Sequence, residues 1–283
     1  MKTIWARACV LALLVLSGCS TGVPEFGLYQ QAYEAQYAES ARVLDRLGTA
    51  EAILRERRAA AEPGIAPFDP DRAGQLLGLD EPPLTAGLRR SLDALKSFND
   101  ALSGLATGEA AAVLSARIGS ASAALSAASQ SILAAGGLAI AAVSSLEGSV
   151  AAALPVLERL AAISDRARFR DALLEAYPDM RALLVALRAG TPDLFEVMLE
   201  ARKTPGSLSG VDGVARADLP LLEEDRRLLA GWVVLLDETL RAMDLAATVI
   251  ADPAAQAGIT ALTEAAVEVQ TLADIIKALR KTN

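Results

Sequence analysis

Apolar residues recur every three or four positions over most of this chain, and nowhere do they alternate with polar residues as in a half-buried strand. This spacing places apolar side chains on one face of a helix. The pattern therefore predicts an all-α fold, an elongated and mainly antiparallel bundle of six to eight helices with long helices at both ends of the chain. We expect residues 25–283 to form a single helical domain.

Proline and glycine set the boundaries of the predicted helices. Five prolines between residues 63 and 84 forbid a continuous helix there. Thr85 suits the N-cap of the next helix, and Gly190 suits the residue after a helix end. Outside a central hairpin, the expected helices cover residues 25–62, 85–106, 165–177, 178–189, 192–203, 220–251 and 253–279.

An apolar hairpin rich in alanine, serine and glycine is expected over residues 109–163, with Gly136 and Gly137 at its tip. Residues 118–146 are 29 consecutive positions without a charge. One interpretation is the central hairpin of the bundle, because small side chains let helices approach closely. The alternative is a membrane-inserting hairpin over residues 118–154, a distant resemblance to helical pore-forming toxins. The many serines favour the first interpretation.

The first twenty residues carry a motif of their own. Lys2 and Arg7 precede an apolar run, and the run ends in Leu16-Ser17-Gly18-Cys19. This segment resembles the precursors of bacterial lipoproteins, in which those four residues form the lipobox. The resemblance implies that residues 1–18 are a removed signal peptide, that Cys19 is lipidated, and that residues 19–24 are a short tether.

The same resemblance implies a location and one partner. Ser20 rather than aspartate after the cysteine favours the outer membrane over retention at the inner membrane. Multiple acyl chains hold a protein at a bilayer effectively permanently. We therefore expect a lipid-anchored protein of the outer membrane that faces the periplasm, with inner-membrane retention and surface exposure as alternatives.

Composition narrows the possible chemistry. Removal of Lys2 and Arg7 with the signal would take the net charge from −8 to −10, which is unfavourable for binding nucleic acid. The chain has no histidine and its cysteines are Cys9 and Cys19, so the mature protein would lack a disulfide. Catalysis through histidine or a thiol, and zinc bound by these groups, are excluded. We expect no cofactor, no metal and no enzymatic activity.

Two groups of side chains remain as candidates for function. Phe26, Tyr29, Tyr33 and Tyr37 share one helical face beside the anchor, and could face the membrane or a partner. The alternative is that they pack inside the bundle. Carboxylates could support a carboxylate-based enzyme, but we expect most of them on solvated helix faces. These acidic positions are Glu223, Glu224, Asp225, Asp237, Glu238, Glu264 and Glu268.

Two further charged features are local. Glu51 and Arg55 are spaced to form an ion pair along the first helix. A small local positive patch is formed by Arg159, Arg166, Arg168 and Arg170. It could meet an anionic partner, but alternating residues on a helix do not share a face, so we expect a solvated surface. The sequence therefore favours a non-catalytic structural or protein-interaction role in the cell envelope, with an unidentified envelope protein as partner and no small-molecule substrate identified.

Overall fold

The computed structural model describes residues 25–61, 79–135, 141–204, 213–254 and 256–281, together with three single positions between 62 and 78. In these residues the fold is helical, and the only extended pairing is one isolated bridge between Lys203 and Val214. The helices are α2 (Glu25–Ala61), α4 (Pro83–Ala106), α5 (Ala111–Ala134), α6 (Ala141–Ala161), α7 (Arg166–Ala189), α8 (Thr191–Arg202), the 3-10 helix η3 (Arg216–Asp218), α9 (Leu219–Ala251) and α10 (Gln256–Lys281).

The predicted all-α bundle is confirmed, with two corrections to its segmentation. Thr85 was expected as an N-cap but lies inside α4, which begins at Pro83. Pro178 was expected to begin a new helix, but it lies inside the continuous helix α7. The buried residues of α7 keep their helical spacing on both sides of this proline, from Phe169 to Leu187. Burial of that face therefore outweighs the backbone hydrogen bond that a proline in a helix removes. The expected tip of the hairpin, Gly136 and Gly137, lies outside the described residues.

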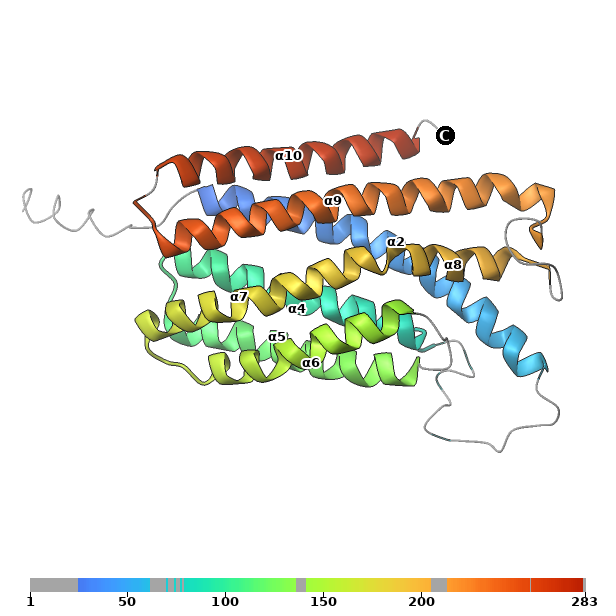
Figure 1. The fold of residues 1–283 in the computed structure, drawn as a ribbon, viewed down its shortest axis with the longest axis horizontal. Coiled ribbons are helices and arrows are strands. Elements are labelled where there is room, and N and C mark those ends of the chain that lie inside the picture. Colours follow the sequence, from blue (N-terminus) through green and yellow to red (C-terminus); the bar gives the residue numbers. More distant parts are fainter. Residues whose placement is uncertain are drawn as a thin grey trace, which may run out of the picture.

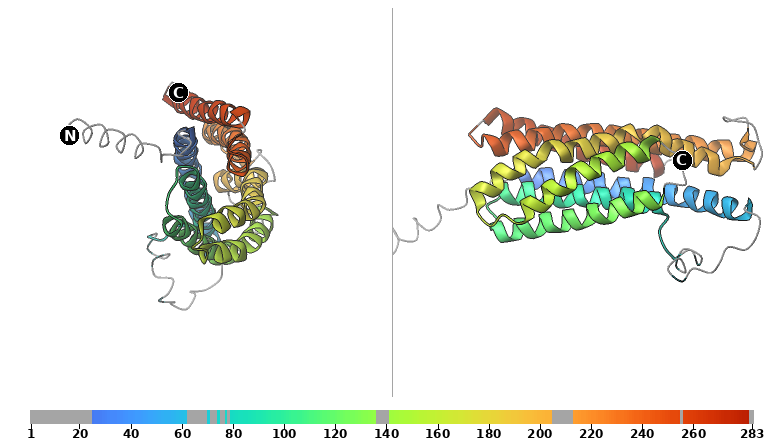
Figure 2. Two further views of the ribbon diagram at one scale, coloured as in Figure 1. Left: turned by 90° about the vertical axis from the view of Figure 1, so that its left-hand side faces the viewer. Right: turned by 60° about the horizontal axis from the view of Figure 1, so that its bottom comes forward.

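The long helices lie side by side, and neighbours in space form a closed circuit (Figures 1 and 2). The order of contacts runs α10, α2, α4, α5, α6, α7, α9 and back to α10, and α8 packs on α2 and α9. One end of the bundle, here called the proximal end, contains the start of α2 and the connections α4–α5, α6–α7 and α9–α10. The opposite, distal end contains the start of α9.

The helices pack through buried residues spaced alternately four and three apart. This spacing repeats every seven residues and favours neighbouring helices crossing at about 20°. In α5 the buried residues that follow it are Leu114, Ile118, Ala121, Leu125, Ala128 and Ile132. The exposed residues between them are alanine, serine or glutamine, so α5 presents an uncharged outer face beyond Arg117.

The seam between α4 and α5 is a close helix contact, which has two glycines of α4 at its ends. A Cβ atom on Gly87 would lie 2.7 Å from Ile132 of α5, and one on Gly104 would lie 2.8 Å from Leu114. Arg90 adds a hydrogen bond to the Ala127 carbonyl at 3.1 Å. Helix α5 therefore packs so closely on α4 that a methyl group added at Gly87 or Gly104 would overlap its side chains.

Candidate functional site

The aromatic face of α2 lies mainly inside the bundle. Phe26, Tyr29 and Tyr33 are each at most 2 % exposed, and all three belong to the main hydrophobic core. Their proposed membrane- or partner-facing role is therefore wrong, because α4 and the neighbouring helices cover this face. Tyr37 is the one member that is only partly buried. The interpretation of these residues as a core stripe is the one that the structure supports.

The tyrosine hydroxyls of this face have buried or half-buried polar surroundings on α4. Tyr29 donates a hydrogen bond to Asn99 Oδ1, and Tyr37 donates one to Asp93. Burial raises the pKa of Tyr29 and Tyr33 well above that of a free tyrosine. Burial, with the hydrogen bond to Asp93, raises the pKa of Tyr37 to about 12. All three hydroxyls are therefore neutral at physiological pH, and those of Tyr29 and Tyr37 act as structural hydrogen-bond donors.

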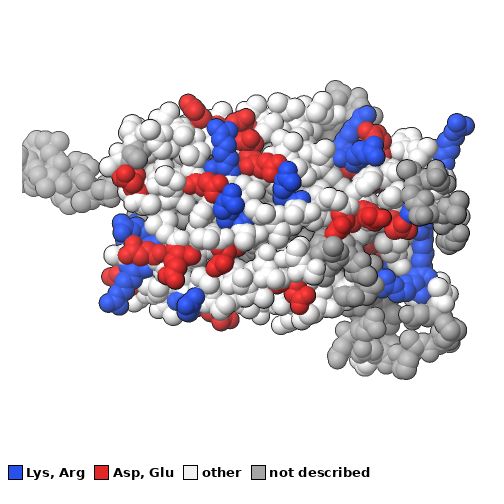
Figure 3. Space-filling model, viewed as in Figure 1, with Lys and Arg blue, Asp and Glu red and all other residues white. Residues whose placement is uncertain are grey.

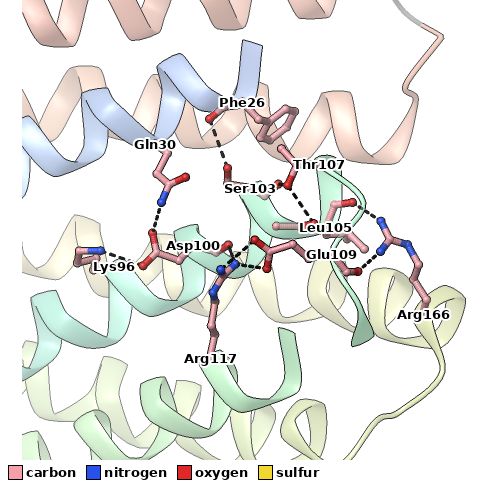
Figure 4. Close-up of polar contacts among 11 residues, drawn as sticks. Phe26, Gln30, Lys96, Asp100, Ser103, Leu105, Thr107, Glu109, Arg117 and Arg166 are labelled. Carbon is pink, nitrogen blue, oxygen red and sulfur yellow. Dashed lines mark hydrogen bonds and ion pairs between the residues drawn. The ribbon is translucent and has the colours of Figure 1, made fainter. Parts of the chain in front are cut away.

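The first turns of α2 are tied to the end of α4 by polar contacts (Figure 4). Ser103 donates a hydrogen bond to the Phe26 carbonyl at 3.3 Å. Gln30 donates one to Asp100 at 3.4 Å, and Lys96 forms an ion pair with the same carboxylate at 2.9 Å. With Phe26 fully buried, these contacts fix the beginning of α2 within the proximal end.

Two arginines connect the other helices of the proximal end to the last turn of α4 (Figure 4). Arg117 of α5 donates to the Asp100 carbonyl at 2.7 Å and forms an ion pair with Glu109. Arg166 at the start of α7 donates to the carbonyls of Leu105 and Glu109. A cation at these carbonyls also interacts favourably with the negative end of the α4 dipole. The proximal end is therefore held as a unit by side chains from four helices.

The remaining arginines of the same local group do not form a patch for a ligand. Arg170 is paired with Asp171 at 2.9 Å, and Arg159 donates to the Pro155 carbonyl of its own helix. The Arg168 backbone is bound by the Asp165 side chain, which caps α7. As expected from the spacing, the Arg159 and Arg170 side chains make separate local contacts.

Farther along α2, its inner face continues as a series of buried polar groups. Gln36 and Trp232 of α9 both donate to Ser40 Oγ, at 2.7 and 2.8 Å. Glu51 is 1 % exposed and accepts hydrogen bonds from the backbone N–H groups of Leu84 and Thr85, at 2.9 and 3.0 Å. Glu51, predicted only to pair with Arg55 along its own helix, thus caps the start of α4 from a different helix.

One of the acidic clusters is also placed differently from expectation. Asp225 is 2 % exposed, and Arg202 of α8 pairs with it at 2.6 Å. Arg46 of α2 adds a weaker contact at 3.8 Å. Asp225 therefore joins α2, α8 and α9 inside the distal half of the bundle, because two arginines offset the cost of burying its charge.

Most of the other acidic residues take part in surface ion pairs. Asp237 pairs with Arg188 at 2.8 Å, and Arg241 pairs with both Glu238 and Glu268. On the face drawn in Figure 3, acidic and basic side chains lie beside one another instead of forming large fields of one sign. Glu264 and Glu268 line a shallow groove along α10, where Arg241 engages Glu268.

The described part of the chain contains no group of three or more aspartate, glutamate, cysteine or histidine side chains that could hold a metal ion. In that part, α5 is the one helix long and apolar enough to cross a membrane by length and composition. The lipobox and Cys19 lie outside the described residues. Comparison with protein-family models, with curated proteins and with solved structures finds no match to this chain.

Proposed function

We propose that this protein is a lipid-anchored component of the cell envelope, on the outer membrane and facing the periplasm, with a non-catalytic structural or protein-interaction role. The lipobox supports the anchor, and Ser20 after Cys19 supports the outer membrane. The absence of histidine and the lipid on the last cysteine leave few routes to catalysis. The role is therefore to hold a helical surface at a fixed place beside the membrane.

The fixing of the first turn of α2 is the observation that carries this proposal. Glu25 begins the helix six residues after Cys19, and Phe26 is already fully buried and held by Ser103. Six residues span at most about 20 Å. A lipid on Cys19 would therefore hold the proximal end close to the bilayer, without a long linker that lets the bundle swing.

The test is membrane fractionation of cells that make the Cys19→Ala variant. We expect the wild-type protein in the membrane fraction and the variant in the soluble fraction, because the lipid on Cys19 is the one membrane attachment that we propose. Cys9→Ala is the matched control, and it should stay with the membrane since Cys9 leaves with the signal peptide. A Cys19→Ala variant that still sediments with membranes would overturn the proposed anchor.

Insertion of residues 118–154 into a membrane is the alternative, and the apolar length of α5 favours it. The α4–α5 seam argues against it, because α5 would have to leave the close contacts at Gly87 and Gly104. We expect vesicles with entrapped dye to stay intact in the presence of Cys19→Ala protein. Dye release that rises with protein concentration would support insertion and count against the interaction role.

A further inference from the structure

A second surface feature lies on the side of the bundle, at the break between α7 and α8. The break at Gly190 and Thr191 opens a groove of about 310 Å³ against α9. The residues that line it are Arg188, Ala189, Thr191, Pro192, Phe195, Arg226, Leu229, Ala230 and Val233. Its floor is apolar, and both charged residues that line it are arginines.

The accessible part of this floor suits an apolar side chain from another protein. Phe195 and Val233 are half-buried, and Ala189, Pro192 and Ala230 are exposed. The volume is at the lower limit for a pocket that encloses a small molecule. An open groove of this size accepts one or two side chains of a docked helix better than it encloses a whole ligand.

Arg226 gives the groove a positive charge. Its guanidinium lies 5.6 Å from the centre of the Phe195 ring, within the range of a cation–π contact. Arg226 and Arg227 share a single carboxylate, Glu223, at 3.3 and 3.4 Å. Because one carboxylate serves two guanidiniums, Arg226 keeps donors and positive charge for a further carboxylate. Arginine beside an aromatic ring is a combination enriched at interaction hot spots.

Arg188 borders the other part of the groove. Asp237 holds its guanidinium through two hydrogen bonds, at 2.8 and 3.1 Å. This pairing fixes the position of Arg188 while its remaining N–H groups stay available. The two cations therefore border an apolar floor that no carboxylate lines.

We propose that this groove docks an acidic amphipathic helix of a partner protein. An apolar side chain of that helix enters the groove over Phe195, and a carboxylate on the same face meets Arg226. This inference rests on the proposed function, since it identifies the interaction surface of a protein held at the membrane. It places the surface on the side of the bundle, away from the anchored end.

Photocrosslinking in cells tests the groove with the full-length chain. Benzoylphenylalanine replaces the exposed Ala230 on the floor, and the control carries it at the exposed Ala123 on α5. We expect an adduct from Ala230 alone, mapped by mass spectrometry to an acidic amphipathic segment of another protein. Combining the probe with Arg226→Glu should reduce this adduct at least tenfold, whereas the exposed Arg170→Glu should leave it unchanged.

Several outcomes would overturn the inference. These are no adduct from Ala230 above the Ala123 control, an adduct on lipid, on a second copy of this chain or on a non-acidic segment, and an adduct that Arg226→Glu does not reduce. Fractionation of the same cells separates this failure from failure of the proposed function. If the protein is membrane-bound without the expected adduct, the groove assignment alone is wrong.

Discussion

The α4–α5 seam and the inner face of α2 achieve close packing in opposite ways. The seam is aliphatic and close, and its fit depends on Gly87 and Gly104. The inner face of α2 buries hydroxyl, amide and carboxylate groups, among them Tyr29, Ser40 and Glu51. The first fixes distance between helices, whereas the second fixes which residues face one another, because each polar group must find its hydrogen-bond partner.

This difference bears on how each region can act. The hairpin looks suited to a membrane from its composition, yet α5 packs closely on α4 at Gly87 and Gly104, and leaving the bundle would break these contacts. The aromatic face looks suited to a surface, yet Tyr29, Ser40 and Glu51 on the same side of α2 form hydrogen bonds with α4 or α9. The difference between the regions is best tested by changing one contact in each.

The largest effect is expected for the aliphatic contacts of α5. Leu125→Ala should lower the free energy of unfolding by about 3–5 kcal/mol, because it leaves a cavity beneath a fully buried side chain. Leu133→Ala is the control, since Leu133 is 62 % exposed and should change stability by less than about 0.5 kcal/mol. Urea unfolding measures both, and equal costs would show that α5 is not packed as described.

The next effect concerns the buried carboxylate of α2. Glu51→Ala should cost about 2–3 kcal/mol, since it leaves the N–H groups of Leu84 and Thr85 buried without their acceptor. Glu51→Gln keeps one acceptor oxygen and should recover part of this loss. Glu56→Ala, at an exposed position of the same helix, is the control. A neutral Glu51→Ala variant in the same urea assay would remove the capping role.

Two glycines on either side of the seam should respond with opposite signs. Gly87→Ala should destabilise by about 1–2 kcal/mol, because its Cβ would lie 2.7 Å from the Ile132 side chain and 3.4 Å from the Ile132 backbone nitrogen. Gly119→Ala should stabilise by up to about 1 kcal/mol, since nothing lies within 4 Å and alanine favours helix. The two melting temperatures should therefore move apart, and parallel shifts would contradict the close approach of α4 and α5.

The smallest effect concerns the ionisation of the tyrosine hydroxyls at high pH. All four tyrosines have a pKa raised chiefly by burial, with Tyr37 at about 12. Their stabilisation is complete below pH 10, near the pKa of unfolded tyrosine, and is lost as pH rises toward and beyond 12. Absorbance of tyrosinate should stay low in native protein at pH 10.5 and rise in urea. Native titration near pH 10 would mean that the hydroxyls are accessible.

The fold could largely be predicted from the sequence because the apolar spacing alone determines which faces are buried. Helix α2, with its end before Pro63, follows from that spacing and one proline. Glu51 and Asp225 could not be placed, because their partners Thr85 and Arg202 come from helices distant in sequence or across a loop. Pro178 was misplaced since its local effect is weaker than the burial of the α7 face. The groove at the break between α7 and α8 forms only when both helices and α9 are in position. The apolar spacing along the sequence does not predict how these three helices are arranged.

The most direct test of the account is the orientation of the lipidated protein on a bilayer. With Cys9 removed and Cys19 acylated, Ala254→Cys at the proximal end or Arg216→Cys at the distal end carries the only free thiol. The α9 helix of 33 residues separates them by about 50 Å. Energy transfer from a dye on that thiol to labelled lipid head groups should be strong for Ala254 and weak for Arg216. Equal transfer from both positions, or the reverse order, would contradict a bundle held by its proximal end.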